Sequence, residues 1–308
     1  MTSPFRLRAA IPAFAVLGVA LLTVPAGAQQ WTPPKTADGQ PNIQGIWEGG
    51  PGTGNAGHSL EEGCCDPEHN KMQGRAAANT GLQTKVIVDP ADGKIPFQPW
   101  AAAKRREHLI NLEASTELAH IEPEDRCSLQ GVPRSQLRGP MQILQTPGQV
   151  VITYEWIHAF RVIPVGNTPH APKGYATWQG DSRGRWDGNT LVVDVTNFRT
   201  DPVNYNRQPW LDSHGTFYSD ALHVVERWTF VDANRIDYEA RIEDPKVFTR
   251  PWTVKFPIIR MKERDFEFIE EACWEGVRVQ NRFDAGRLAR KAGDVRPHSH
   301  SEPSGAVR

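Results

Sequence analysis

Beyond its first 28 residues, the chain lacks any apolar run near the roughly 20 residues that a membrane-spanning helix needs. It also lacks a charge bias, because 35 basic and 36 acidic side chains leave a net charge of −1. A surface without excess charge offers no electrostatic footprint for nucleic acid or an anionic membrane. We therefore expect no nucleic-acid partner and no membrane span after signal cleavage, and a small molecule as the substrate or ligand.

Motifs for common cofactors and nucleophiles are also missing. The glycine cluster GTGNAG, at residues 52–57, has no flanking strand and helix that would make it a dinucleotide site. No G-x-S-x-G elbow occurs, and Ser182 in GDSRG lacks a strand-to-helix context. The run GCCDPEHN, at residues 63–70, has metal-capable side chains, but their spacing matches no zinc template. We predict no cofactor and no metal site.

Cysteine is scarce, and its four positions are Cys64, Cys65, Cys127 and Cys273. Four cysteines allow three pairings, and the sequence alone does not choose among them. Adjacent cysteines rarely bridge each other because the geometry is strained. We favour a disulfide between Cys127 and Cys273, which would tie a loop to a late strand. Cys64 and Cys65 are then free or paired elsewhere.

The first residues have the features of an export signal. Arg6 and Arg8 precede an apolar run at residues 9–24, and Ala26-Gly27-Ala28 fits the rule for cleavage after small residues. The run is short for a membrane anchor. We predict a cleaved signal peptide at residues 1–28, a periplasmic protein, a single domain at residues 29–284 and a disordered tail at residues 285–308.

After Cys127, hydrophobic residues recur at every second position. These segments cover residues 141–146, 149–165, 180–198, 219–244, 250–261 and 266–275. Short turns such as Pro147-Gly148 and Asp187-Gly188 separate them. Sequential strands with short turns predict an all-β protein, with an antiparallel meander curled into a barrel or a tight sandwich. We expect the barrel to run from about Met141 to Glu275.

The chain before this meander is rich in Gly, Pro, Asn and Asp. Residues 29–79 have too few apolar side chains for a core of their own, so they predict a long irregular extension that drapes over the barrel. Within it, residues 42–47 have the pattern of a first strand. One short helix is predicted at residues 100–115, where Ala, Glu, Leu, Arg and Lys have good helix propensity.

The stretch GDSRGRWDGNTLVVDVTNF, at residues 180–198, predicts a hairpin that turns at Asp187-Gly188. After the turn, alternate residues from Leu191 to Val195 face one side and Asp194 faces the other. Asp194 therefore either faces solvent or lines a cavity. Asp181 and Arg183 lie where a loop enters the hairpin. They either form structural salt bridges or reach the mouth of a barrel.

The mature chain resembles a large family of exported, mostly uncharacterised bacterial proteins in five segments: WTPPKTADGQPNIQGIW, IHAFRVIPV, GDSRGRWDGNTLVVDVTNF, LHVVERWTF and EDPKVFTRPW. The resemblance covers nearly the whole mature chain, and the hairpin is its most specific part. It implies an antiparallel, lipocalin-like (calycin-type) β-barrel with extra loops, and it implies no particular activity. That family usually has His after the EAC of the late segment, whereas this chain has Trp274. A role for that histidine is absent here.

A first candidate site lies at residues 154–160. If one strand runs through them, Arg161 lies on one face and the other face carries Tyr154, Trp156, His158 and Phe160. A histidine among aromatic side chains suits a ligand cavity, where burial keeps it neutral and available as a base. We hypothesise that His158 transfers protons. The alternative is a structural histidine that is held by hydrogen bonds.

A second candidate lies in the segment LHVVER. His223 and Glu226 are three residues apart, so on a strand only one of them can face a cavity. Glu226 belongs to the more apolar face, where a carboxylate is costly to bury unless it is paired. Its possible partners are Arg161, Arg183 and Arg134. Glu226 is therefore either a catalytic acid or half of a structural ion pair.

His214 lies in a polar loop with Asp212 and Asp220 nearby, and is either an oriented base or an exposed loop residue. The hypothesised catalytic residues are His158, Asp181, Arg183, Glu226, His223 and His214. The hypothesised substrate-binding residues are Tyr154, Trp156, Phe160, Arg161 and Arg134.

Three functions compete. The first is a cofactor-independent periplasmic enzyme, a lyase, isomerase or hydrolase, that acts on a small apolar or aromatic molecule in a barrel cavity by histidine-based acid–base catalysis. The alternative is a periplasmic lipocalin-like binding protein for a hydrophobic ligand or a sugar. The third is a structural module of the cell envelope. A histidine near a carboxylate in a cavity would favour the enzyme, and a filled barrel would favour the structural module.

Overall fold

The structure is a computed structural model, and it describes residues 31–49, 60–61, 86–113, 115–137, 139–200, 208–262, 266–268, 273, 280, 283–284, 286–288 and 291. All of them belong to one unit, Trp31–Arg308. The predicted signal peptide, Cys64, Cys65 and most of the predicted C-terminal tail lie outside the described residues.

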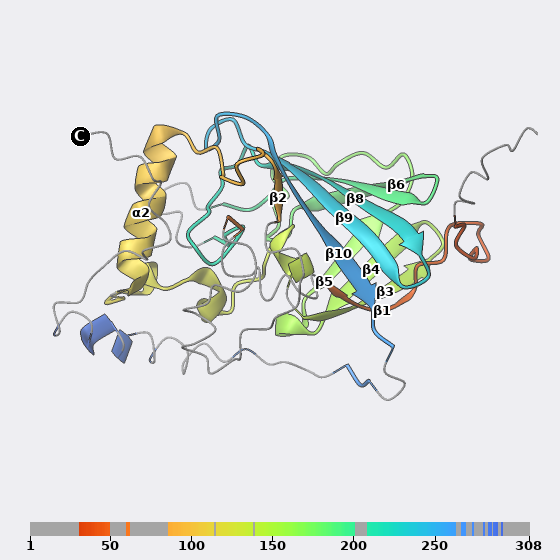
Figure 1. Ribbon diagram of the computed structural model, residues 1–308, viewed down its shortest axis with the longest axis horizontal. Coiled ribbons are helices and arrows are strands. Elements are labelled where there is room, and N and C mark those ends of the chain that lie inside the picture. Colours follow the sequence, from red (N-terminus) through yellow and green to blue (C-terminus); the bar gives the residue numbers. More distant parts are fainter. Residues whose placement is uncertain are drawn as a thin grey trace, which may run out of the picture. The chain divides into compact units, whose positions relative to one another are not determined.

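The described residues form one large sheet of antiparallel strands that curls into a barrel (Figure 1). Its order is β5-β4-β3-β1-β10-β9-β8-β7-β6, and each neighbouring pair is antiparallel. A short strand, β2 (Ile87–Asp89), pairs with β10. The prediction of an all-β antiparallel barrel is confirmed. The other strands are β1 (Gly45–Gly49), β3 (Pro140–Thr146), β4 (Gln149–Tyr154), β5 (Phe160–Pro164), β6 (Asp181–Asp187), β7 (Thr190–Thr196), β8 (His223–Asp232), β9 (Arg235–Glu243) and β10 (Trp252–Arg260).

The barrel is nearly closed where β5 meets β6. Because every step along the nine-strand path reverses direction, the two end strands run parallel. Val165 and Gly184 form a parallel bridge, and the amide of Gly166 donates to the carbonyl of Gly184 at 2.9 Å. A Cβ atom at Gly184 would lie 2.9 Å from Cγ2 of Ile163, so glycine is what lets the two strands approach here.

The barrel occupies a different part of the chain than predicted. β1, which comes from the N-terminal extension, lies between β3 and β10, and Trp47 is paired with Met141 on one side and Arg260 on the other. Part of the extension is therefore a strand of the barrel rather than a covering. The last strand ends at Arg260. Residues 266–268 and 273, the described part of the predicted final strand, are not in a strand.

Aromatic side chains fill the interior of the barrel. Trp228 meets Tyr238 edge to face with ring centroids 5.0 Å apart, and Tyr238 lies 4.7 Å from Phe256. Trp47 and Phe230 form another edge-to-face pair at 6.0 Å. All five rings are buried, and burying one such side chain stabilises the fold by about 2–3 kcal/mol. The middle of the barrel is therefore packed core, and space for a ligand has to lie at an end.

The predicted helix is confirmed as α2 (Pro99–Glu113). Its buried residues recur at helical spacing and are Ala101, Arg105, His108 and Leu109. Arg105 donates to Glu61 at 2.6 Å and to the carbonyl of His214 at 2.9 Å. The helix therefore docks through polar as well as apolar contacts.

Short 3₁₀ turns are the remaining helical elements of the described residues before residue 260, and they span Leu118–His120, Pro123–Arg126, Arg134–Leu137 and Trp156–His158. Within the part of the chain that the structure describes, no helix has both the length and the apolar character needed to cross a membrane.

Cys127 and Cys273 form a disulfide, as predicted, with their sulfur atoms 2.09 Å apart. The bridge joins residues 146 positions apart, and closing a loop of that length corresponds to about 4–5 kcal/mol in the chain-entropy account. Cys127 directly follows the turn Pro123–Arg126. The disulfide therefore anchors the segment that leads into β3.

Burial gives His108 an unusual titration. Burial, reinforced by Lys104, lowers the pKa of its imidazole from 6.5 to about 4. The residue is 2 % exposed, and its ring stacks on Trp210 with centroids 5.2 Å apart. The folded protein therefore resists protonation of a histidine that the unfolded chain protonates below pH 6.5.

We predict that His108 makes the protein less stable in mild acid. Its contribution is complete above pH 6.5 and is lost as the pH falls to about 4. The full loss is about 3 kcal/mol, because one pKa unit corresponds to about 1.4 kcal/mol. His108→Phe keeps a ring against Trp210 and should remove this part of the pH dependence, measured by urea unfolding at neutral and mildly acidic pH. The control His158→Phe replaces an exposed ring and should keep it. Identical pH dependence in all three proteins would contradict the assignment.

Candidate functional site

The chain breaks between β4 and β5, where the sequence predicts one continuous strand. Residues Trp156–His158 form a 3₁₀ turn, and Ile157 and His158 have φ angles of 56° and 38°. These left-handed conformations reverse the chain, so β4 and β5 pair as a hairpin. The alternation of faces does not pass through the turn. The prediction of a shared face is therefore wrong for Tyr154, Trp156, His158 and Phe160.

Because of this turn, the predicted site residues lie in different environments. His158 is exposed, and Phe160 is 67 % exposed. Arg161, predicted as a substrate-binding residue on the face opposite His158, is 3 % exposed and buried within the barrel, and it is not among the residues that line the pocket described next. Tyr154 and Trp156 remain together, because both line a pocket at the end of the barrel. His158 is not among the residues that line it.

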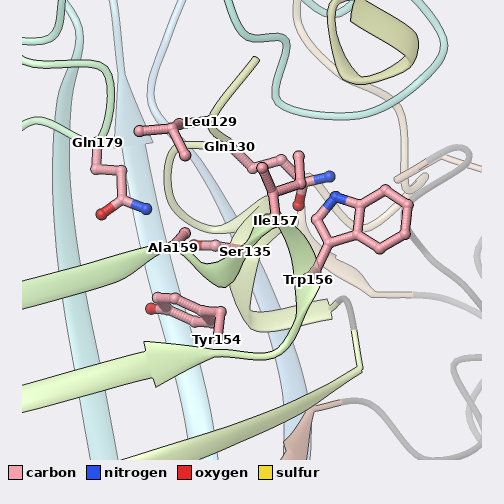
Figure 2. A pocket seen from close by; sticks show the side chains of 8 residues that line it. All are labelled: Leu129, Gln130, Ser135, Tyr154, Trp156, Ile157, Ala159 and Gln179. Atoms are coloured by element: carbon pink, nitrogen blue, oxygen red, sulfur yellow. The ribbon is translucent and has the colours of Figure 1, made fainter. Parts of the chain in front are cut away.

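This pocket lies where β4 ends and where β5 and β6 begin (Figure 2). Counted with the open solvent at its mouth, the empty space is about 230 Å³, but the enclosed part is only about 10 Å³, which is about the room that one water molecule needs. A larger ligand therefore binds only if side chains at the mouth move apart. The lining residues are Leu129, Gln130, Ser135, Tyr154, Trp156, Ile157, Ala159 and Gln179.

Two buried glutamines supply polar groups to the pocket. Gln130 is 4 % exposed and Gln179 is 8 % exposed. Oε1 of Gln130 and Nε2 of Gln179 have no hydrogen-bond partner among the described residues. Figure 2 shows the Gln179 side chain near Tyr154 and Ala159, and the Gln130 side chain beside Ile157 and Trp156. A buried polar atom without a partner costs about 1–3 kcal/mol, so each of these two atoms needs a water or a ligand atom as its partner.

A network of buried ion pairs contacts Gln130 through its Nε2 atom. Nε2 of Gln130 donates to Glu124 at 2.6 Å. Arg134 pairs with Glu124 and, at 2.7 Å, with Glu122, and it also donates to the carbonyl of Asp212 at 3.2 Å. Arg134 is not among the residues that line the pocket. Its contacts hold in place the segment that carries Gln130.

Deeper in the barrel, Arg161 and Glu226 form an ion pair whose side chains are 3 % and 0 % exposed. Glu226 also accepts from the hydroxyl of Tyr238 at 2.8 Å, and Nε of Arg161 donates to Ser182 at 2.9 Å. Arg161 is thus the partner of Glu226 among the three that the sequence offers. Burial would lower the pKa of Arg161, but the Glu226 carboxylate outweighs burial and raises it. The guanidinium therefore stays charged.

The same pair influences the floor of the pocket. Burial raises the pKa of Tyr154, which Arg161 partly offsets and Glu226 reinforces. The Tyr154 hydroxyl accepts a hydrogen bond from Nε2 of Gln136 at 3.0 Å. Tyr154 is therefore an uncharged phenol at neutral pH.

A second constellation, the outer network, lies on the outside of β6, β7 and β8. His170, from the loop between β5 and β6, places Nδ1 2.8 Å from Asp181 and Nε2 2.8 Å from Asp194. Nε2 of His223 lies 2.9 Å from Asp194, and Arg183 donates to Asp181 at 2.6 Å. His223 therefore faces outward while Glu226 faces inward, as their spacing requires.

The outer network decides two alternatives that the sequence left open. Asp181 and Arg183 form a salt bridge, and the imidazole beside Asp181 belongs to His170. Asp194 is 43 % exposed and lies outside the barrel. Partial burial would raise the pKa of Asp194, but hydrogen bonds from His223 and His170 outweigh it and hold the pKa below its usual value. Asp194 therefore remains a carboxylate over the physiological range.

Asp212 and Asp220, the two aspartates near His214, bind other groups than its imidazole. The Asp212 carboxylate accepts from the backbone amides of His214 at 3.0 Å, Thr216 at 3.1 Å and Leu60 at 3.3 Å. Asp220 pairs with Lys246 at 2.6 Å. Asp212 therefore shapes the loop rather than orienting the imidazole of His214.

Among the described residues, no three His, Cys, Asp or Glu side chains are arranged as metal ligands. In comparisons with known proteins, the sequence matches no protein-family model and no curated protein. The geometry of the pocket and of the outer network therefore has to carry the functional interpretation.

Sequence reasoning missed Gln130, Gln179 and His170. A single glutamine in a loop has no spacing signal, although Gln179 directly precedes the predicted hairpin and Gln130 closely follows Cys127. His170 lies in GNTPHAPKG, a loop without periodicity. Its place between two predicted strands was the one signal that pointed to it.

We predict that removing one partner of the Arg161–Glu226 pair strongly destabilises the protein. Arg161→Met should lower the free energy of unfolding by about 3–5 kcal/mol, because it leaves Glu226 buried and unpaired. The double variant Arg161→Met/Glu226→Leu should be more stable than Arg161→Met, since neither charge remains. Urea unfolding measures both.

The control for this pair is Lys246→Met. It breaks the exposed pair with Asp220 and should cost less than about 1 kcal/mol. A double variant that is no more stable than Arg161→Met would show that Glu226 does not depend on the arginine.

Proposed function

We propose that the protein binds a small uncharged molecule in the pocket at the end of its barrel, as an exported periplasmic binding protein. The observation that carries this proposal is the pair of buried amide atoms, Oε1 of Gln130 and Nε2 of Gln179, without partners among the described residues. Proteins satisfy about 90 % of their buried polar groups. Two exceptions that line one pocket therefore indicate a ligand that completes them.

The walls of the pocket support the same proposal. Tyr154 and Trp156 supply aromatic surface, Leu129 and Ile157 supply aliphatic surface, and no charged side chain is among the lining residues. Aromatic rings with a few fixed polar groups are typical of small-molecule sites. Because aromatic side chains fill the described interior, the ligand is smaller than the long hydrophobic ligands expected of an open barrel. The packed interior alone would fit a structural module, and the pocket favours binding.

A pocket-filling variant tests this proposal. Acetophenone, a small uncharged aromatic ketone, should shift the NMR signals of Trp156 and of residues 129–135. Ala159→Leu places a larger side chain in the pocket lining and should weaken this binding at least about tenfold, since each tenfold corresponds to about 1.4 kcal/mol of lost contact.

The matched control is Ala103→Leu on the exposed side of α2, which should leave acetophenone binding unchanged. Failure of acetophenone to shift the pocket signals would count against the proposal. So would equal binding by the Ala159→Leu protein.

A second candidate function is proton-transfer catalysis by a cofactor-independent lyase, isomerase or hydrolase. The observation that favours it is the His223–Asp194 hydrogen bond of 2.9 Å in the outer network. Both ring nitrogens of His170 face carboxylates, whereas Nδ1 of His223 makes no hydrogen bond with a described residue. A histidine held by a carboxylate through one nitrogen can exchange a proton through the other.

Hydrolysis of p-nitrophenyl acetate tests this candidate, because an accessible imidazole promotes attack on the ester and the release of p-nitrophenol. His223→Gln and Asp194→Asn should each lower the rate at least about tenfold, within the range typical of a lost acid–base group. His158→Gln removes an exposed histidine outside the network and serves as the control. A rate that falls as much in His158→Gln as in His223→Gln would rule out a special role for the network.

A further inference from the structure

We propose that the outer face of β3, β4 and β5 binds the same face of a second copy of this protein, so that two copies form a weak symmetric dimer. The three strands lie side by side in the sheet (Figure 1). Every second side chain of a strand points away from the core. All three strands lie within the described residues, and none of their outward side chains carries a charge. This surface is called the uncharged face; its polar members are glutamine or threonine, and its apolar members are Pro140, Leu144, Val151, Phe160, Val162 and Pro164.

The apolar side chains of the uncharged face are adjacent across the strands. Val151 on β4 is paired with Leu144 on β3 and with Val162 on β5. Leu144 and Val162 are 40 % and 41 % exposed, and Phe160, two residues before Val162 on β5, is 67 % exposed. An aromatic ring therefore lies beside a row of aliphatic side chains. Phe160, which the sequence predicts as a substrate-binding residue, belongs to this outer surface and not to the pocket.

The outer face of β8 and β9 shows how the same sheet meets solvent elsewhere. Arg227 lies opposite Glu239 across these two strands, and His223 lies opposite Glu243. Arg241 donates to Glu243 at 2.8 Å. Charged side chains keep a sheet surface hydrated and oppose its association with other surfaces. The uncharged face lacks this protection, so covering its apolar side chains is favourable.

Charge complementarity favours a second copy as the partner. A charged partner surface would have to bury its charges against the uncharged face, and burying an unpaired charge is costly. In a dimer with two-fold symmetry, each copy presents the same patch to the other, so uncharged surface covers uncharged surface and no like charges meet. Two sheets pack face to face about 10 Å apart, which lets the Phe160 ring of each copy lie over the aliphatic row of the other.

The polar members of the uncharged face favour a protein partner over a lipid bilayer. Gln142 and Thr153 are paired across β3 and β4, and Thr153 is paired with Phe160 on β5. In hydrocarbon, amide and hydroxyl groups would lose their hydrogen bonds to water without replacement. Across a two-fold axis, the same groups meet the amides and hydroxyls of the other copy, which both donate and accept.

The size of the uncharged face sets the strength of the dimer. An outward residue covers about 30 Å² of a sheet and the whole face about 300 Å², because strands lie about 4.8 Å apart and outward residues recur about every 6.7 Å. A stable interface buries about 800 Å² on each partner, and smaller interfaces form transient complexes. We therefore expect a reversible dimer with a Kd weaker than about 1 µM.

Analytical ultracentrifugation from low micromolar to millimolar protein tests this proposal. The wild-type protein should pass from monomer to dimer as its concentration rises. Val162→Glu places a carboxylate on the uncharged face and should weaken the dimer at least about tenfold, because the charge would be buried without a partner. Phe160→Ser removes the most exposed ring of the face and should also weaken the dimer.

The matched control is Val231→Glu. Val231 lies on β8, outside the uncharged face, and its exposure of 38 % is close to that of Val162. The same added charge there should leave the Kd of the dimer unchanged. All three variants replace exposed side chains, so urea unfolding should give midpoints close to that of the wild type. In a second measurement, the NMR signals of residues 140–164 should shift with protein concentration, and those of β8 and β9 should not.

Three results would overturn the proposal. The first is a wild-type protein that stays monomeric at millimolar concentration. The second is a dimer that Val162→Glu and Phe160→Ser leave intact, or that Val231→Glu weakens equally. The third is monomeric protein that floats with vesicles of phosphatidylethanolamine and phosphatidylglycerol through the uncharged face, which would make that face a membrane-binding surface. None of these results changes the ligand binding of the pocket, which acetophenone measures separately.

Discussion

The buried pair of Arg161 and Glu226 is the interaction on which the nearly closed barrel depends. Arg161 on β5 reaches Ser182 on β6 and Glu226 on β8, and Glu226 also accepts from Tyr238 on β9. The backbone between β5 and β6 is joined by a single bridge, so side chains have to complete the closure. Burying two charges is costly, and the cost is offset because each charge has hydrogen bonds as well as its partner.

The pocket and the outer network both depend on the position of β6, the strand that Arg161 contacts through Ser182. β6 turns Ser182 into the barrel and Asp181 and Arg183 outward, because neighbouring residues of a strand face opposite sides. Outside, Asp181 and Asp194 hold His170, which belongs to the loop after β5. The same loop ends at Gln179 in the pocket. The outer network and the pocket are therefore two ends of one fixed segment, and the disulfide at Cys127 fixes the opposite wall that carries Gln130.

The sequence predicted elements whose signals are local, and missed those that depend on distant contacts. The hairpin at residues 180–198 and the helix at Pro99–Glu113 were found because turn residues and helix propensity act within a few positions. The faces of Glu226 and His223 were also assigned correctly as alternatives, since strand alternation is strict. His158 was misplaced because Ile157 and His158 adopt positive φ without being glycine, which no residue pattern announces. Arg161 was one of three possible partners for Glu226, and only the curvature of the barrel brings it within reach.

By itself, the sequence determined the all-β class, the succession of strands, the polar turns and the short helix, because these follow from periodicity and backbone preference along one chain. Only the tertiary structure decided that β1 enters the barrel between β3 and β10, that aromatic rings fill its middle, and that two loop glutamines meet at its end. Those outcomes depend on which surfaces pack together and which buried polar atoms find partners. Such pairings join residues far apart in the chain, so no local pattern encodes them.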